Sequence, residues 1–157
     1  MTKIHPIFLF ILGGFFFILD RFLKYTIFLN QNHPHYIWKP WIGWEYFANS
    51  GVAFGIPIPW FASFLYTPLI FLGLILYYKK KKKPNVFLQI AYIFIFFGAA
   101  SNLIDRIVYH FTIDYFRIFT SILNIADIMI VIGAFLFFYE EIKIHHKREN
   151  QNYPQRL

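Results

Sequence analysis

Four long apolar segments constrain this chain more than any other feature of its sequence. They cover about residues 6–29, 60–78, 86–108 and 122–139. Each is close to the ~20 apolar residues that a helix needs to cross the hydrocarbon core of a bilayer. Helices are expected because every backbone polar group in lipid must find its hydrogen-bond partner within the protein. The segments therefore predict an all-α integral membrane protein with four transmembrane helices.

The composition agrees with this class and excludes others. Hydrophobic residues make up 58% of the 157 residues, with 22 Phe and 11 Tyr, and only 15% are charged. A soluble domain carries about 25% charged residues. The net charge of +7 does not indicate nucleic-acid binding, because the basic residues flank the apolar segments. The chain has no Cys, which excludes a disulfide framework and a thiol nucleophile, and we expect neither a metal nor another cofactor.

The distribution of Lys and Arg predicts the orientation in the membrane. A run of five lysines occupies most of the loop 79–85, and the tail 140–157 is also basic. The long loop 30–59 has only Lys39, and the connection before the fourth segment has a single Arg. By the positive-inside rule both termini are cytoplasmic. A second interpretation of the lysine run, binding of anionic lipid, stays open beside the topological one.

The loop 30–59 is rich in aromatic residues and carries turn signals. Its stretch WIGWEYFANSGVAFG is typical of short strands, with a turn at Asn49, Ser50 and Gly51. We therefore expect a small extracytoplasmic region of strands and loop between the first two helices. No internal repeat or linker divides the chain, so residues 1–157 are expected to form a single membrane domain.

All four aspartates fall on the predicted outer side, at similar depth. They are Asp20, Asp105, Asp114 and Asp127. A charged side chain at the centre of a membrane helix costs about 2.5–3.5 kcal/mol or more. Such residues usually face the interior of a helix bundle and often mark a functional site. The convergence of four acids indicates a site at the outer face.

Polar residues lie three or four positions from each acid of the helices, on the same helical face. The groups are Asp20 with Lys24, Asn102 with Asp105 and Arg106, and Asn124 with Asp127. We expect structural ion pairs between Asp20 and Lys24 and between Asp105 and Arg106.

Asp114 and Asp127 have no adjacent cation and are the better candidates for chemistry. Two close carboxylates cannot both ionise easily, so the pair shares a proton. One can then activate a water molecule as a base while the other donates a proton to a carbonyl. The residues alone leave two alternatives: a small proton-coupled transporter that uses the buried aspartates, and a non-enzymatic membrane scaffold.

Five motifs in order resemble those of the lipoprotein signal peptidases, also called signal peptidase II. They are DRFLK (20–24), FANSGVAFG (47–55), GAASNLIDRI (98–107), IDYF (113–116) and LNIAD (123–127). The resemblance covers nearly the whole chain and includes four spans with both ends inside.

The resemblance implies an intramembrane aspartic endopeptidase of the bacterial inner membrane. Such an enzyme removes the signal peptide from diacylglyceryl-modified prolipoproteins, cutting before the lipidated cysteine, and is inhibited by globomycin-type peptides. Its catalytic pair would be Asp114 and Asp127, at the outer face. The supporting positions would be Asn102, Asn124, Asn49, Gly51, Asp20, Lys24, Asp105 and Arg106. Its partners would be the prolipoprotein and membrane lipid, and we expect a monomer.

The chain departs from the family pattern at four positions. Ser101 stands in place of the usual Gly, Leu123 in place of Phe, and Ile128 in place of Ser, and Val52 is a mild variant. The segment 115–122 between the two catalytic aspartates is shorter than usual. These differences affect the expected shape of the outer loop more than the expected chemistry.

Overall fold

The structure is a computed structural model that describes residues 5–51, 59, 61–81 and 84–152. Val52, two lysines of the run and the end of the tail therefore lie outside the described residues. The described part holds four helices and four strands. In chain order these are α1 (Pro6–Leu29), β1 (His35–Trp38), β2 (Ile42–Asn49), α2 (Ala62–Lys80), α3 (Val86–Tyr109), β3 (Thr112–Ile118), β4 (Ser121–Leu123) and α4 (Ile125–Asn152).

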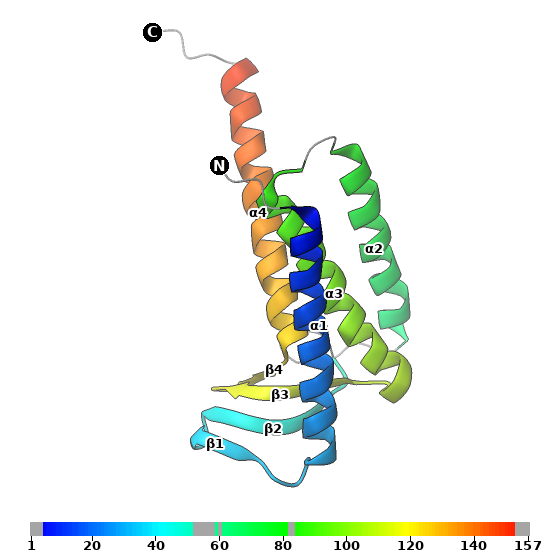
Figure 1. The fold of residues 1–157 in the computed structure, drawn as a ribbon, viewed down its shortest axis with the longest axis vertical. Helices are drawn as coiled ribbons and strands as arrows, with labels where there is room; N and C mark the ends of the chain where they lie inside the picture. Colours follow the sequence, from blue (N-terminus) through cyan, green and yellow to red (C-terminus); the bar gives the residue numbers. More distant parts are fainter. Residues whose placement is uncertain (1–4, 52–58, 60, 82–83, 153–157) are drawn as a thin grey trace.

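The helices form a bundle in which α3 is central, and the sheet covers one end (Figure 1). Helix α3 packs against α1, α2 and α4, and its contact with α4 is the most extensive. Two glycines permit this approach: a Cβ on Gly98 would lie 2.6 Å from the carbonyl oxygen of Ala126, and one on Gly133 would lie 2.9 Å from that of Ala91. Small residues at a helix contact let the backbones come close in a membrane.

The helices expose large apolar side chains and bury charged ones near the sheet, which is the reverse of a soluble bundle. On α1, Ile18 and Phe22 are 67% and 63% exposed, whereas Asp20 and Lys24 are fully buried. Large exposed apolar surfaces mark contact with lipid or a partner. Helices α1 and α3 are each long and apolar enough to cross a membrane.

The sheet is antiparallel, with the strand order β1-β2-β3-β4. Its first two strands confirm the predicted β region between the first two helices. The pairing of β2 with β3, however, joins this region to the connection between α3 and α4. The sequence did not predict a strand in this connection. The stretch TIDYFRI of β3 is rich in β-branched and aromatic residues, a signal for a strand.

The predicted turn at the end of β2 is present. The side-chain oxygen of Asn49 accepts a hydrogen bond from the backbone N–H of Gly51 at 2.9 Å, which is an Asx turn. Residues 52–58, which follow this turn, lie outside the described part of the chain.

Helix α4 differs most from its predicted range of 122–139. It begins at Ile125 and continues to Asn152, so most of the expected tail is helical. The start is later because residues 121–123 belong to β4. The continuation is rich in Glu, Lys and Arg, which favour helix without any need for burial.

Candidate active site

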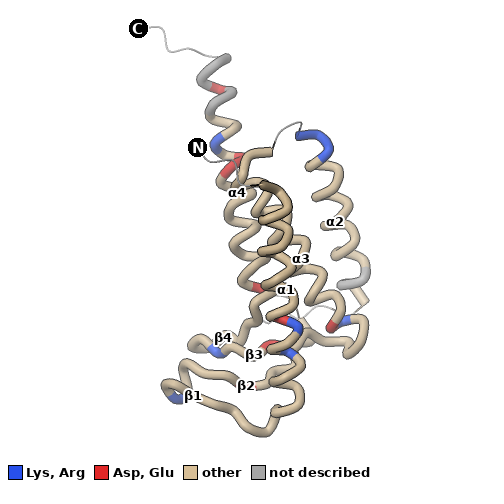
Figure 2. Tube along the Cα trace, in the orientation of Figure 1, with Lys and Arg blue, Asp and Glu red and all other residues tan. Residues whose placement is uncertain are grey.

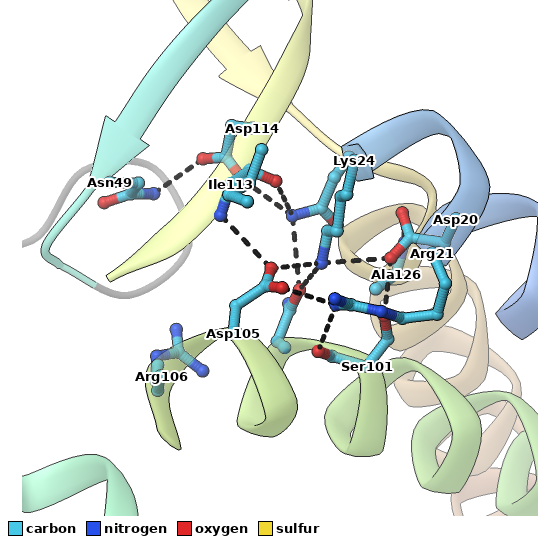
Figure 3. Close-up of polar contacts among 12 residues, drawn as sticks. Asp20, Arg21, Lys24, Asn49, Ser101, Asp105, Arg106, Ile113, Asp114 and Ala126 are labelled. Atoms are coloured by element: carbon cyan, nitrogen blue, oxygen red, sulfur yellow. Dashed lines mark hydrogen bonds and ion pairs between the residues drawn. The ribbon is translucent and has the colours of Figure 1, made fainter. Parts of the chain in front are cut away.

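A buried polar cluster lies where the sheet meets the helices (Figure 3). All four predicted aspartates belong to it, and Asp20, Asp105 and Asp114 are fully buried. Its members come from α1 and α3, from the end of β2, from β3 and from the start of α4. The principal ones are Asp20, Lys24, Asn49, Ser101, Asn102, Asp105, Asp114, Asn124 and Asp127.

Asn124 and Asp127 form a capping box at the start of α4. The side-chain oxygen of Asn124 accepts from the backbone N–H of Asp127 at 2.7 Å, and the Asp127 carboxylate accepts from the Asn124 backbone N–H at 3.4 Å. We expected Asn124 to share a helical face with Asp127, but Asn124 instead precedes the helix. The spacing N-x-x-D is itself a signal for this motif. It places the Asp127 carboxylate in the first turn, where the helix dipole favours negative charge.

The same Asn124 side chain also holds Asp114. Its amide nitrogen donates to one carboxylate oxygen of Asp114 at 2.6 Å, and the amide of Asn49 donates to the other at 2.8 Å. Burial and the negative charge of Asp127 raise the pKa of Asp114 to about 7, although the two amide donors act in the opposite direction. A carboxyl group in this state can hold a proton near neutral pH.

Asn102 fixes the other side of Asp127. Its amide nitrogen donates to Asp127 at 2.8 Å, and its side-chain oxygen accepts from Lys24 at 2.7 Å and from Asn124 at 3.2 Å. An ammonium group can only donate, so Lys24 determines which end of the Asn102 amide faces Asp127. The orientation of this donor is set before any substrate arrives.

Lys24 uses all three of its donors inside the cluster. Besides Asn102 it contacts Asp20 at 3.0 Å and Asp105 at 2.8 Å. This confirms the predicted pair of Asp20 and Lys24. Asp105 is also paired with Arg21, a residue that the sequence analysis did not single out.

The predicted ion pair between Asp105 and Arg106 was wrong. The Arg106 guanidinium donates to the backbone oxygen of Gly51 at 3.4 Å and lies 6.0 Å from the ring centre of Tyr66. Neighbouring residues on a helix point in different directions, so adjacency in the sequence does not make a pair.

Four further hydrogen bonds, which residue spacing did not predict, hold Asp20 and the start of α4 together. The Tyr115 hydroxyl donates to Asp20 at 2.9 Å and accepts from the backbone N–H of Ile125 at 3.0 Å. The same Asp20 oxygen accepts from the backbone N–H of Ala126 at 3.2 Å, and the Ser101 hydroxyl donates to the other oxygen at 2.6 Å. The departure at Ser101 thus gives Asp20 a hydrogen bond that Gly could not supply.

The charges of the cluster leave one acid pair without a cation. Asp20 and Asp105 are balanced by Lys24 and Arg21. Asp114 and Asp127 contact amides, and a shared proton would leave them a single negative charge. Within the described residues, no three His, Cys, Asp or Glu side chains are grouped as a metal site requires.

A cavity of about 170 Å³ opens beside Asp127, between α2, α3 and α4. Asn102 and Arg106 line it from α3, and Tyr66 and Thr67 line it from α2. The two residues of α2 were not predicted, although polar side chains in an apolar segment were a signal for them. Of the carboxyl groups in the cluster, that of Asp127 lines this cavity.

Comparison with known proteins identifies the family. The family model described as signal peptidase (SPase) II matches residues 12–143. The chain belongs to this family. It is thus an aspartic peptidase. The family favours this function over the transporter and the scaffold, which the residues alone left open.

Relatives and solved structures agree with this assignment. The chain is 35% identical over 128 residues to the lipoprotein signal peptidase of Clostridium novyi, covering 76% of this chain and 86% of the relative. It is 34% identical over 140 residues to that of Fusobacterium nucleatum, with 83% and 84% covered. A bacterial membrane enzyme solved by the in meso method at 2.3 Å superposes with a TM-score of 0.77 at 26% identity, covering 88% of this chain and 87% of that one.

Proposed function

We propose that Asp114 and Asp127 are the catalytic dyad of a peptidase that removes the signal peptide from diacylglyceryl-modified prolipoproteins. The activity of a lipoprotein signal peptidase follows from the family. The observation that carries the residue assignment is the double role of Asn124. One side chain donates to Asp114 and caps the backbone of Asp127, so it sets the two carboxyl groups beside each other.

The reaction needs one ionised and one protonated aspartate. The ionised carboxylate takes a proton from a water molecule, whose oxygen attacks the carbonyl carbon before the lipidated cysteine. The protonated partner hydrogen-bonds to the carbonyl oxygen and gives it the proton as the tetrahedral intermediate forms. The intermediate collapses when the C–N bond breaks: the leaving nitrogen takes the proton that the base had gained from water, and a hydroxyl group of the intermediate returns its proton to the other aspartate, which leaves a carboxylic acid and the dyad in its starting state. Atoms and charge balance without a metal.

The remaining predicted residues support this pair. Asn49, Asn102 and Asn124 donate to the dyad, and the ion pairs of Asp20, Lys24 and Asp105 hold the helices in register. Gly51 lets the chain turn after Asn49 and presents its carbonyl to Arg106.

The signal helix of the substrate would lie between α2, α3 and α4. A second cavity of about 480 Å³ continues from the one at Asp127, and Ile70, Ile95 and Ile130 line both. Its lining is apolar, as a signal peptide within the bilayer requires. The acyl chains of the substrate would stay in the membrane while the cleavage segment reaches the dyad.

In the proposed topology residues 1–157 form one domain in the bacterial inner membrane, with four spans and both termini cytoplasmic. Figure 2 supports it, because the lysines at the end of α2 lie at the end of the bundle opposite the sheet. Helix α2 has 19 residues, which span ~28 Å at 1.5 Å per residue, near the ~30 Å of a bilayer core. The dyad would then lie at the outer face, and the enzyme would act as a monomer.

The test compares a diacylated prolipoprotein with its unlipidated form as substrates for the purified enzyme. Cleavage of the lipidated form alone, blocked by globomycin, is the expected result. Asp114→Asn and Asp127→Asn should each lower kcat by at least ~10³-fold while the protein still inserts, since each removes a member of the acid–base pair. Substantial cleavage by either variant would refute the assignment of the dyad.

A further inference from the structure

A separate apolar groove lies on the other side of α2, between α1, α2 and α3. Its volume is about 290 Å³, near the lower limit of the ~300–1,000 Å³ of typical ligand sites. Phenylalanines supply much of its lining: Phe10 from α1, Phe71 from α2, and Phe96 and Phe97 from α3. The groove shares no residue with the cavity at Asp127.

Free positive charge borders this groove at the end away from the sheet. Lys79 is part of its lining, and Lys80 follows in the last turn of α2. Both are exposed, and no carboxylate within the described residues forms an ion pair with either. Lys81, in contrast, is paired with Glu141 at 3.0 Å. Two lysines therefore remain available to an anion from outside the chain.

We propose that this groove binds one anionic glycerophospholipid, with an acyl chain along the phenylalanines and the phosphate at Lys79, which lines the groove, while Lys80 adds positive charge at the same end. The apolar lining fits a hydrocarbon chain, and lysines next to a membrane attract anionic headgroups. The aromatic rings of Tyr78 and Tyr92 lie at the same end of the groove, where the glycerol region of a lipid would be.

The headgroup end of the groove is too far from the dyad to hold the lipid of the substrate. Tyr92 of the groove and Asn102 of the active site lie on one helix, α3, about ten residues or ~15 Å apart. In the proposed orientation the basic end lies in the inner leaflet, whereas the diacylglyceryl group of the substrate enters from the outer one. The bound lipid is therefore a resident phospholipid of the inner leaflet.

Native mass spectrometry can test the proposal without any cleavage assay. The enzyme is released from mixed micelles that contain equal amounts of phosphatidylglycerol and phosphatidylcholine. We expect one retained phosphatidylglycerol with about tenfold preference, the order expected for one or two lysines beside a phosphate. The double variant Lys79→Gln/Lys80→Gln should reduce the preference to within about twofold. Lys143→Gln, a matched change on α4 at the same end, should leave it unchanged.

A second variant distinguishes lipid binding in the groove from attraction to the lysines alone. Ile75→Trp places a larger side chain in the lining and keeps both lysines, so retention of the anionic lipid should fall at least about fivefold. Unchanged retention in this variant would mean surface attraction alone and would overturn the proposal. Equal retention of both lipids by the wild type, or an equal loss in Lys143→Gln, would do the same. Prolipoprotein cleavage by all variants shows that they are folded, and it tests the proposed function separately.

Discussion

At each end of the bundle an asparagine caps a helix and also contacts a buried carboxylate of another element. At the sheet end Asn124 caps α4 and donates to Asp114 at 2.6 Å. At the opposite end Asn85 caps α3 through the N–H of Leu88 at 2.9 Å and donates to Glu140 at 2.5 Å. Asp114 is fully buried, and Glu140 is only 2% exposed.

The difference lies in the residue three positions into each helix. At the sheet end it is Asp127, whose carboxyl group is close enough to that of Asp114 for the two charges to interact. At the other end it is Leu88, so Glu140 has no acidic neighbour through this motif. One carboxylate bound by an amide is a structural contact, whereas two that must share a proton can perform acid–base chemistry. The cap alone does not make a site.

The sharpest test of this comparison is Asn124→Ala against Asn85→Ala. Each change removes a helix cap worth about 1 kcal/mol, so the Tm should fall by similar amounts in detergent. Only Asn124→Ala should lower kcat, by about 10²-fold, because a small misplacement of catalytic groups has effects of that size.

Substitution of serine at the same two positions distinguishes the effect of helix capping from the effect of the amide hydrogen bond to the carboxylate. Ser is also a good N-cap but does not supply the amide donor to the carboxylate. Asn124→Ser should therefore regain most of the lost Tm while kcat stays low. Recovery of activity together with Tm would show that the cap, and not the donor to Asp114, is what catalysis needs.

A smaller effect is expected for the tyrosine that anchors α4. Tyr115→Phe removes the bonds to Asp20 and to the N–H of Ile125 but keeps the ring, which stacks on Trp44 at 5.9 Å. We expect kcat to fall about tenfold with KM within twofold, because Asp127 moves while the substrate cavity keeps its shape. Tyr92→Phe is the control, since no described residue hydrogen-bonds to that hydroxyl. A parallel change in KM would indicate general loosening instead of positioning.

The smallest effect is expected at the other carboxylate. Glu140→Gln keeps an oxygen for Asn85 and removes a buried charge, so activity should stay within about twofold and the Tm should not fall. Steady-state cleavage and thermal unfolding measure the two quantities. A loss of activity close to that of Asp114→Asn would mean that both ends take part in the reaction.

Much of this architecture could be predicted because lipid imposes strong rules. The range of α1 matches the predicted 6–29, and α3 ends one residue beyond its predicted limit. The gathering of the four aspartates was also predictable, since charges in a membrane helix must face the interior.

The partners within the cluster could not be read from spacing alone. Asp105 pairs with Lys24 and Arg21 of α1 because the rotation of two packed helices, and not sequence distance, decides which side chains meet. The strand β3 was missed because its partner β2 lies some seventy residues earlier. The role of Tyr115 depends on that same pairing, which brings β3 under the start of α4.

If Asp114 and Asp127 share one proton, the pH dependence of kcat/KM must report its loss. The proton is present below the apparent pKa of the pair and is lost as the pH rises through it, and the pKa of Asp114 lies at about 7. We therefore expect kcat/KM to fall about tenfold per pH unit above that value and also to fall in acid, as the second carboxylate gains a proton. A kcat/KM that stays constant from about pH 6 to about pH 9 would contradict it.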